Sequence, residues 1–306
     1  MVTARREHFG YLLEPGLQDI FYEVYDQMPS MINELYSVQT TDEPYVTDVS
    51  IGTLGDFPKF EGTVEYDRPY QQYKKIYDFP EYAKGFRIER KLYDDDRYDE
   101  INKQPQGLAI SANRRRETHA AELFNKASDA DVTGPDGVPL CSDEHPTKSP
   151  DGPAERSNLH SLTLDQDNLQ TVKNSMRETL DDRGGRISVV PDTLLVPVDL
   201  EETAWSLIEA QYVVGTRAEG SQTNPNIHQG RYKLIVWDYL DGAGDDSPWF
   251  LIDSRYAAMF LKWYDRIPIE FAMEEDFDTL VAKFRAYMRY ESGWSDWIWI
   301  HGSFPQ

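Results

Sequence analysis

The residues best suited to chemistry in this sequence are Cys141 and His145, four positions apart in Leu140-Cys-Ser-Asp-Glu-His-Pro. A thiol activated by an imidazole is the pair that cysteine nucleophiles use, but the two side chains must meet in space. Both residues here belong to one proline-rich loop, where such a pairing is more often incidental. We therefore predict no catalytic residue at this position.

The histidines do not form a metal-binding pattern. None of the six lies three or four residues from another, so no helix face carries two of them. They are His8, His119, His145, His160, His228 and His301. The single cysteine excludes an intramolecular disulfide and any zinc site with several thiolates. Sequence motifs for phosphate loops, dinucleotide binding, serine hydrolases and zinc proteases are absent. We predict no metal and no cofactor.

Two acidic clusters resemble metal ligands only loosely. Asp94, Asp95 and Asp96 are adjacent, so in a strand they would point to alternate faces and would not converge. A solvated turn is the better interpretation. Asp241, Asp245 and Asp246 stand among glycines, but the spacing and terminal glutamate of a calcium loop are missing. We interpret this segment as a plain acidic turn.

The charge of the chain is one-sided. It has 54 acidic and 31 basic residues, a formal net charge of -23. Nucleic-acid affinity comes largely from Lys and Arg, so most of this surface would repel a phosphate backbone. The charge suits a protein that lies near DNA without binding it, and equally any very soluble protein. Arg114, Arg115 and Arg116 form a basic cluster that we expect to make inter-chain ion pairs.

Alternating patterns predict helices and strands in the first third of the chain. Leu17 to Leu35 shows one apolar helix stripe, bent at Pro29. Three strands are predicted, and Asp67-Arg68-Pro69 is a turn signal between the last two, which makes a two-stranded excursion. The strands are Tyr45 to Ile51, Lys59 to Tyr66 and Phe86 to Leu92. This excursion is rich in tyrosine, cannot bury itself, and needs a surface that nothing else in the chain obviously supplies.

The rest of the chain reads as a mixture of helices and short strands. A long helix is predicted from Pro105 to Ala127, and a loop rich in Pro, Gly and Ser follows from Ser128 to Ser161. Thr163 opens a capping box before a helix that Gly184-Gly185 stop, and Asp199 caps a short helix. Further strands are predicted at Ile187 to Val198, Lys233 to Tyr239, Trp249 to Asp253, Ile267 to Met273 and Trp294 to Ile300, with Thr279 to Ala286 less clearly assigned. The class is α+β without a repeat.

The chain has no apolar segment long enough to span a bilayer and no secretory signal, so cytoplasmic synthesis is the simplest expectation.

Several short sequence segments, in the same order along the chain, resemble those of the Mu-like major head subunit group of tailed bacteriophages, which has the Hong Kong 97-type capsid fold. The resemblance covers about Phe86 to Trp294. Cys141 stands where the group has an aromatic residue, and the N-terminal third matches by architecture only. The segments are Phe86-Arg-Ile-Glu-Arg-Lys-Leu-Tyr-Asp-Asp-Asp, Ala121-Glu-Leu-Phe-Asn-Lys-Ala, Pro135-Asp-Gly-Val-Pro-Leu-Cys-Ser-Asp-Glu-His-Pro, Asn158-Leu, Pro191-Asp-Thr-Leu-Leu-Val-Pro-Val-Asp-Leu-Glu, Trp249-Phe-Leu-Ile and Arg266-Ile-Pro-Ile-Glu.

The resemblance implies a domain organisation. Residues 1–44 would be an N-terminal arm with its helix, and residues 57–90 an extended β-hairpin loop lying over a neighbouring subunit. Residues 45–56 and 91–189 would form the peripheral domain, with a spine helix at 105–127. Residues 190–269 would form the axial domain, and residues 270–306 would supply return strands to both.

The resemblance also implies a function. The protein would be a structural major capsid protein, not an enzyme, that assembles through pentamers and hexamers into an icosahedral shell around phage double-stranded DNA. It would be synthesised in the bacterial cytoplasm and reside in the virion capsid, without a membrane. Its partners would be itself, DNA bound without sequence specificity, and portal, scaffold and decoration proteins. Expected inter-subunit contacts are Tyr66, Arg68, Tyr70, Tyr73, Lys74, Lys75, Tyr77, Arg114, Arg115 and Arg116.

Alternatives remain open at this stage. An encapsulin-like compartment shell would share the fold, and a monomeric hydrolase or carbohydrate-binding protein would use exposed aromatic and acidic residues. Some members of the fold cross-link a lysine to an asparagine, and Lys74, Lys75 and Lys84 lie in the matching loop. No catalytic carboxylate can be assigned, so we predict no cross-linking. The start at Met1 and the lack of a long helical pro-region favour the absence of a cleaved scaffold segment.

Overall fold

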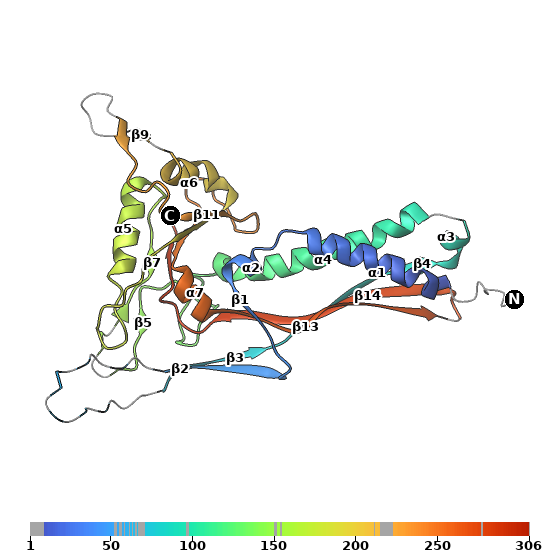
Figure 1. The fold of residues 1–306 in the computed structure, drawn as a ribbon, viewed down its shortest axis with the longest axis horizontal. Helices are drawn as coiled ribbons and strands as arrows, with labels where there is room; N and C mark the ends of the chain where they lie inside the picture. Colours follow the sequence, from blue (N-terminus) through green and yellow to red (C-terminus); the bar gives the residue numbers. More distant parts are fainter. Residues whose placement is uncertain are drawn as a thin grey trace.

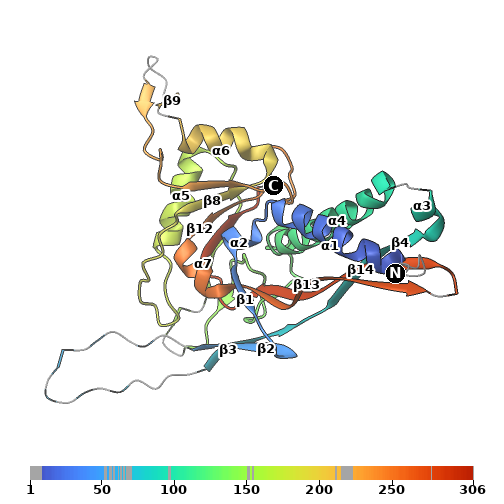
Figure 2. The same cartoon turned by 45° about the vertical axis from the view of Figure 1, so that its right-hand side comes forward.

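The computed structural model describes residues 9–51, 54, 57, 59–60, 62, 64, 66, 71–95, 98–149, 152–153, 155–210, 212–214, 223–276 and 278–305. It shows a long arm, in which two helices lie along an elongated sheet, and a compact unit at one end of that arm (Figures 1 and 2).

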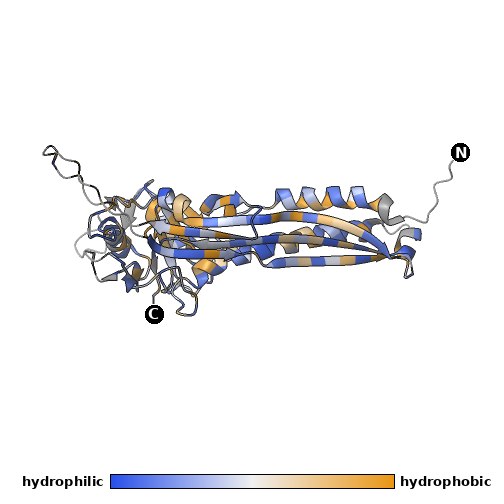
Figure 3. Ribbon diagram, turned by 90° about the horizontal axis from the view of Figure 1, so that it is seen from below, coloured by the Kyte–Doolittle hydropathy of each residue, from blue (hydrophilic) through white to orange (hydrophobic). Residues whose placement is uncertain are grey.

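The sheet of the arm has four strands in the order β1-β13-β14-β4. Its two central strands are β13 (Leu261–Asp276) and β14 (Val281–Trp294), which form a long hairpin. β1 (Ser37–Thr40) runs parallel to β13, and β4 (Glu81–Glu89) runs antiparallel to β14. Figure 3 shows hydrophilic and hydrophobic residues alternating along these strands, as expected when one sheet face is covered.

Two helices cover one face of this sheet. α1 (Phe9–Gln27) and α4 (Tyr98–Asn125) lie side by side along the arm (Figure 1). Their apolar stripes are buried against the strands because the strands present alternate side chains to the same side. The residues buried between these layers are Leu17, Phe21, Ile88, Ile101, Leu108, Ala109, Phe271, Ala282, Phe284 and Ala286.

The compact unit is built on a five-stranded sheet. Its order is β11-β8-β12-β15-β7, with β11 (Lys233–Val236), β8 (Thr193–Val196), β12 (Trp249–Ile252), β15 (Ile300–Ser303) and β7 (Leu159–His160). α5 (Gln166–Arg177) and α6 (Glu201–Ile208) pack against one face, in a cluster with Trp249 and Leu251. The other face of β12, with Phe250 and Ile252, joins the core that holds the unit to the arm.

The remaining elements are short. They are α2 (Ile32–Leu35), α3 (Arg90–Asp94), η2 (Val198–Leu200), α7 (Ser254–Phe260), and the strand pairs β2 (Tyr45–Ile51) with β3 (Gln71–Asp78), β5 (His145–Pro146) with β6 (Glu155–Arg156), and β9 (Tyr212–Val214) with β10 (Thr223–Pro225).

The mixed helix and sheet class is confirmed, but the predicted strand pairing of the excursion is wrong. Phe86 to Leu92 was expected to pair with Lys59 to Tyr66. Instead β4 pairs with β14 along its whole length, and the chain enters α3 at Arg90. The described residues of 59–66 lie in no strand. The far end of the same chain therefore supplies the partner surface of β4, whereas β3 pairs with β2.

Helix boundaries also differ from the sequence expectation. The first helix begins at Phe9, eight residues before Leu17, and the chain leaves it entirely before Pro29. α4 starts at Tyr98, so Pro105 lies inside it. Asp165, not Thr163, caps α5, because its carboxylate accepts a hydrogen bond from the Asn168 backbone N–H at 2.8 Å.

Two further expectations for the compact unit are wrong. Asp199 does not cap α6, since its carboxylate accepts from the Gly244 backbone N–H at 2.9 Å. The stretch expected as an aromatic strand up to Ile300 is a turn that leads into β15. The five-stranded sheet of this unit includes β7 and β15, which lie outside residues 190–269, and the division into domains stays a prediction.

Candidate functional site

The chain between β2 and β3 exposes large apolar side chains. The two strands pair in antiparallel register from Tyr45 with Asp78 to Ile51 with Gln71. Beyond that last pair, the described apolar residues are all exposed, with Tyr66 at 88%. They are Leu54, Phe57, Phe60, Val64 and Tyr66. Because scattered exposure of single apolar residues is normal but a run of them is not, this segment is a candidate contact surface.

The predicted contact residues on β3 divide into two kinds. Lys74 is exposed. Tyr77, only 1% exposed, packs against Tyr264 with ring centroids 5.0 Å apart, and Lys75 lies 5.3 Å from the ring centroid of Trp294. Tyr73 donates from its hydroxyl to the Pro146 carbonyl at 3.3 Å. Tyr77 therefore has almost no surface left for a neighbour, and it anchors β3 to its own subunit. Arg68 and Tyr70 lie outside the described residues.

The three arginines of α4 point to different surroundings. Arg116 donates to the carboxylate of Asp265 and to the Tyr25 hydroxyl, both at 3.0 Å, so it is part of the fold. Arg115 donates to the Tyr82 hydroxyl at 3.4 Å. Arg114 is exposed and makes no hydrogen bond or ion pair with the residues that the structure describes. Arg114 and Arg115 thus remain available for contacts, whereas Arg116 is not.

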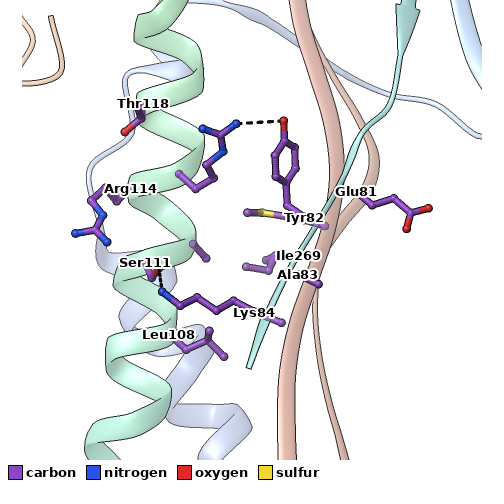
Figure 4. Close-up of a pocket in the computed structure, with 13 residues that line it drawn as sticks. Glu81, Tyr82, Ala83, Lys84, Leu108, Ser111, Arg114, Thr118 and Ile269 are labelled. Carbon is purple, nitrogen blue, oxygen red and sulfur yellow. Dashed lines mark hydrogen bonds between the residues drawn. The ribbon is translucent and has the colours of Figure 1, made fainter. Parts of the chain in front are cut away.

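Arg114 and Arg115 line a groove between α4 and β4 (Figure 4). Its volume is about 520 Å³, and Leu108, Ile269 and Met288 contribute to its apolar floor. Lys84 crosses it to donate to the Ser111 hydroxyl at 3.2 Å. β4 is the edge strand, so on its outer side its backbone pairs with no described strand. The groove therefore combines an open strand edge, an apolar floor and three basic side chains.

The catalytic-looking pair of the sequence has a structural role. Cys141 is buried, and burial strongly raises the pKa of its thiol, which disfavours the nucleophilic thiolate. His145 is buried as well; its Nδ1 lies 2.7 Å from the Asp136 carboxylate and its Nε2 3.0 Å from the Asn158 side-chain oxygen. The ring stacks on Trp297. Both residues are thus engaged in packing and hydrogen bonding.

The acidic clusters do not form metal sites in the part of the chain that the structure describes. No group of three His, Cys, Asp or Glu side chains there is placed to hold a metal ion. Asp94 instead forms an ion pair with Arg90 at 3.6 Å, one helical turn away. Within the same residues, no helix has the length and apolar character needed to cross a bilayer.

Comparison with known proteins decides the family. The model of the phage capsid protein family matches residues 72–301. The chain belongs to this family. This capsid protein is therefore a structural protein of the kind that forms virion shells, as the sequence analysis predicted. A search of curated proteins finds no match. The narrower resemblance to the Mu-like group stays a prediction.

Solved structures confirm the Hong Kong 97-type fold. The procapsid of bacteriophage JBD30 matches with a TM-score of 0.56 at 13% identity, over 97% of this chain and 75% of that one. The mature capsid of bacteriophage PhiM1 matches with 0.56 at 12% identity, over 92% and 88%. A virus-like particle from Pyrococcus furiosus matches with 0.52 at 9% identity, over 94% and 98%.

Sequence reasoning missed the groove. The basic cluster on α4 was identified, but Tyr82 and Lys84 on the facing strand were not linked to it. The alternation in Glu81 to Glu89 signals a strand, yet nothing in the sequence says that this strand lies beside α4 rather than beside residues 59–66.

Proposed function

We propose that this capsid protein is a major head subunit that assembles through pentamers and hexamers into an icosahedral shell around phage double-stranded DNA, without enzymatic activity. The observation that carries the proposal is the run of exposed apolar residues between β2 and β3. A subunit that remained a monomer would leave these side chains in water. A shell would bury them against the next copy.

The groove between α4 and β4 is the surface that we assign to this loop. Residues 52–70 carry four acidic and two basic side chains, together with three exposed aromatic rings, Phe57, Phe60 and Tyr66. The groove offers Lys84, Arg114 and Arg115 above an apolar floor, beside an unpaired strand edge. Charge, apolar surface and backbone hydrogen bonding are therefore complementary. Because loop and groove are different patches, the contact is heterologous and can close into rings.

The decisive experiment removes the loop and keeps the hairpin. Ile51 pairs with Gln71, so residues 52–70 can be replaced by a two-residue Asn-Gly turn that joins β2 directly to β3. A deletion of Glu61 to Lys84 would be less clean, because it would also remove β3 and part of β4. We expect a folded, soluble subunit that forms no shells under electron microscopy. Closed shells from this variant would contradict the proposal.

The groove is tested separately by charge reversal. Arg114→Glu with Arg115→Glu should greatly reduce shell formation while circular dichroism stays unchanged, because both side chains are exposed. Arg87→Glu is the matched control, since Arg87 is an exposed arginine on β4 that does not line the groove. Equal shell yields from the two variants would show that the loop docks elsewhere.

The remaining parts of the proposal concern partners. The net charge of -23 supports a shell wall that lies near packaged DNA without binding it tightly or by sequence. We also propose that the protein is synthesised in the host cytoplasm and resides in the virion. Portal, scaffold and decoration proteins are further proposed partners. The match to the phage capsid family favours a virion shell over an encapsulin-like compartment. Nuclease-protected DNA inside particles purified from infected cells, rather than a cargo protein, is the expected result.

A further inference from the structure

A second basic cluster lies on the compact unit, far along the chain from the groove. Lys173 and Arg177 are one turn apart on α5 and so share a face of that helix. Arg231 precedes Tyr232, whose side chain packs in the same apolar cluster as Val172 and Met176 of α5. This packing brings Arg231 to the α5 face. Burial lowers the pKa of Lys173, and the nearby charges of Arg231 and Arg177 lower it further.

Among the residues that the structure describes, no carboxylate forms an ion pair with this cluster. Lys173 donates to the Gln170 side-chain oxygen at 2.6 Å, whereas Arg177 and Arg231 form no side-chain hydrogen bond or ion pair with any described residue. Beneath them, the hydroxyl of Tyr232 is buried without a hydrogen-bond partner. Like charges one helical turn apart repel each other. Three such cations in a chain with 54 acidic residues therefore point to a carboxylate supplied from outside the subunit.

The environment of His228 is also positively charged. This side chain is fully buried, and its ring nitrogens have no hydrogen-bond partner of good geometry, although the Gln166 backbone lies close by. Burial lowers the pKa of His228, and Lys173 and Arg231 lower it further. The positive charges of Lys173 and Arg231 thus lie near His228, and the residue before it in the chain, Ile227, is exposed.

A patch of opposite charge lies on η2 and α6 of the same unit. Trp205 of α6 is 57% exposed, and Val198, the first residue of η2, is also exposed. Glu201 and Glu202 occupy the first turn of α6, and both are exposed without a basic partner among the described residues. Tryptophan is enriched at the energetic centres of interfaces. This patch, Val198, Glu201, Glu202 and Trp205, is called here the α6 patch.

We propose that the basic cluster of one copy (Lys173, Arg177 and Arg231) receives the α6 patch of the next copy around a ring. The two surfaces complement each other in charge, and each carries exposed apolar side chains. They are different patches of one unit, so the contact is heterologous and is repeated by every member of the ring. The inference rests on the proposed function, because it requires that copies assemble. It assigns a second contact, independent of the loop and the groove.

Cysteine cross-linking tests the contact directly. The only native cysteine, Cys141, is 1% exposed, so we expect that only the introduced thiols react. Arg231→Cys and Glu201→Cys are made in separate chains, mixed, assembled and oxidised. We expect a disulfide-linked dimer that needs both chains. The control replaces Arg231→Cys by Arg87→Cys, an exposed position on the arm, and should give none.

Charge exchange provides a second readout. Lys173→Glu with Arg231→Glu should lower the shell yield about tenfold or more, because it places like charges opposite each other. Adding Glu201→Lys and Glu202→Lys in the same chain should restore much of that yield. Circular dichroism and elution volume identify any variant that fails to fold. For such a variant, the cross-linking experiment alone tests the proposed contact.

The outcomes separate the two levels of inference. If the unsubstituted protein forms no particles, the proposed function fails. If particles form but the mixed cysteine chains give no dimer, this contact is wrong and the proposed function stands. If Lys173→Glu with Arg231→Glu assembles normally but retains less DNA, the cluster meets phosphate rather than a second copy, and the inference is overturned.

Discussion

Replacing Arg116 by methionine tests whether this arginine stabilises the subunit itself. Its guanidinium lies 3.0 Å from the Asp265 carboxylate and 3.0 Å from the Tyr25 hydroxyl, and 5.2 Å from the ring centroid of Trp263. It thereby ties α1, α4 and β13 together. Methionine keeps much of the length of the side chain but removes the charge and every hydrogen bond.

The expected cost follows from what is left behind. Asp265 keeps one hydrogen bond, from the Trp263 indole N–H at 3.0 Å, but loses its cation. Breaking a buried pair by removing one partner costs about 3–5 kcal/mol. The two side chains are 14% and 12% exposed, so water screens them slightly and we expect the lower end. A loss of about 3 kcal/mol corresponds to a drop in melting temperature of about 6 °C in a chain of this size.

Urea unfolding of the unassembled subunit, followed by tryptophan fluorescence, measures this difference. Arg114→Met is the matched control, because the same substitution at an exposed position should change the free energy of unfolding by no more than about 0.5 kcal/mol. Adding Asp265→Asn to Arg116→Met should recover part of the loss, because it removes the unpaired buried charge. Equal unfolding midpoints for Arg116→Met and Arg114→Met would refute the reasoning.

Three further predictions concern ionisable groups. Burial lowers the pKa of His301 well below its ordinary value, so below about pH 6.5 the unfolded chain binds more protons than the folded one. The free energy of unfolding should therefore fall as the pH drops below about 6.5. In urea titrations at several pH values, His301→Gln should make the free energy of unfolding less dependent on pH. The Lys283 ammonium and the Thr279 backbone hold the pKa of Asp276 at about 2, so its stabilising effect on the β13–β14 turn should persist down to acid pH and vanish as the pH approaches that value; by NMR, Lys283→Met should raise this pKa. The thiol of Cys141 should not react with a thiol reagent in the folded protein and should react fully in denaturant, and rapid reaction of the native protein would contradict its buried position.

Local periodicity predicted the elements that depend on local sequence. The α4 stripe and the strand at Tyr45 to Ile51 were found because apolar spacing alone specifies them. The long β13–β14 hairpin was reduced to fragments, since register shifts between Asp265 and Glu270 interrupt the alternation that marks a strand. A segment with such register shifts forms a strand only because the hydrogen bonds to its partner strand hold it extended.

The candidate site was predicted only in part, because the missing information is long-range. Adjacent residues of a helix are turned by about 100° from each other. Arg114 and Arg116, two positions apart, therefore point to nearly opposite sides of α4, but the sequence does not say which side faces water and which faces an aspartate on β13. Likewise, nothing near Glu81 to Glu89 reveals that β14, nearly two hundred residues later in the chain, is its partner.

The antiparallel hairpin of β13 and β14 has a mechanical consequence. Both strands run along the long axis of the arm (Figure 1). A short turn leads from β14 into β15 of the compact unit. The turn joins the two strands at the far end of the arm, so both covalent backbones carry a pull along the arm. Any sliding of one strand past the other would load their perpendicular hydrogen bonds together in shear. Peeling them one at a time would require a force across the sheet. A shell wall stretched by its contents would apply the first kind of force, which this arrangement resists best.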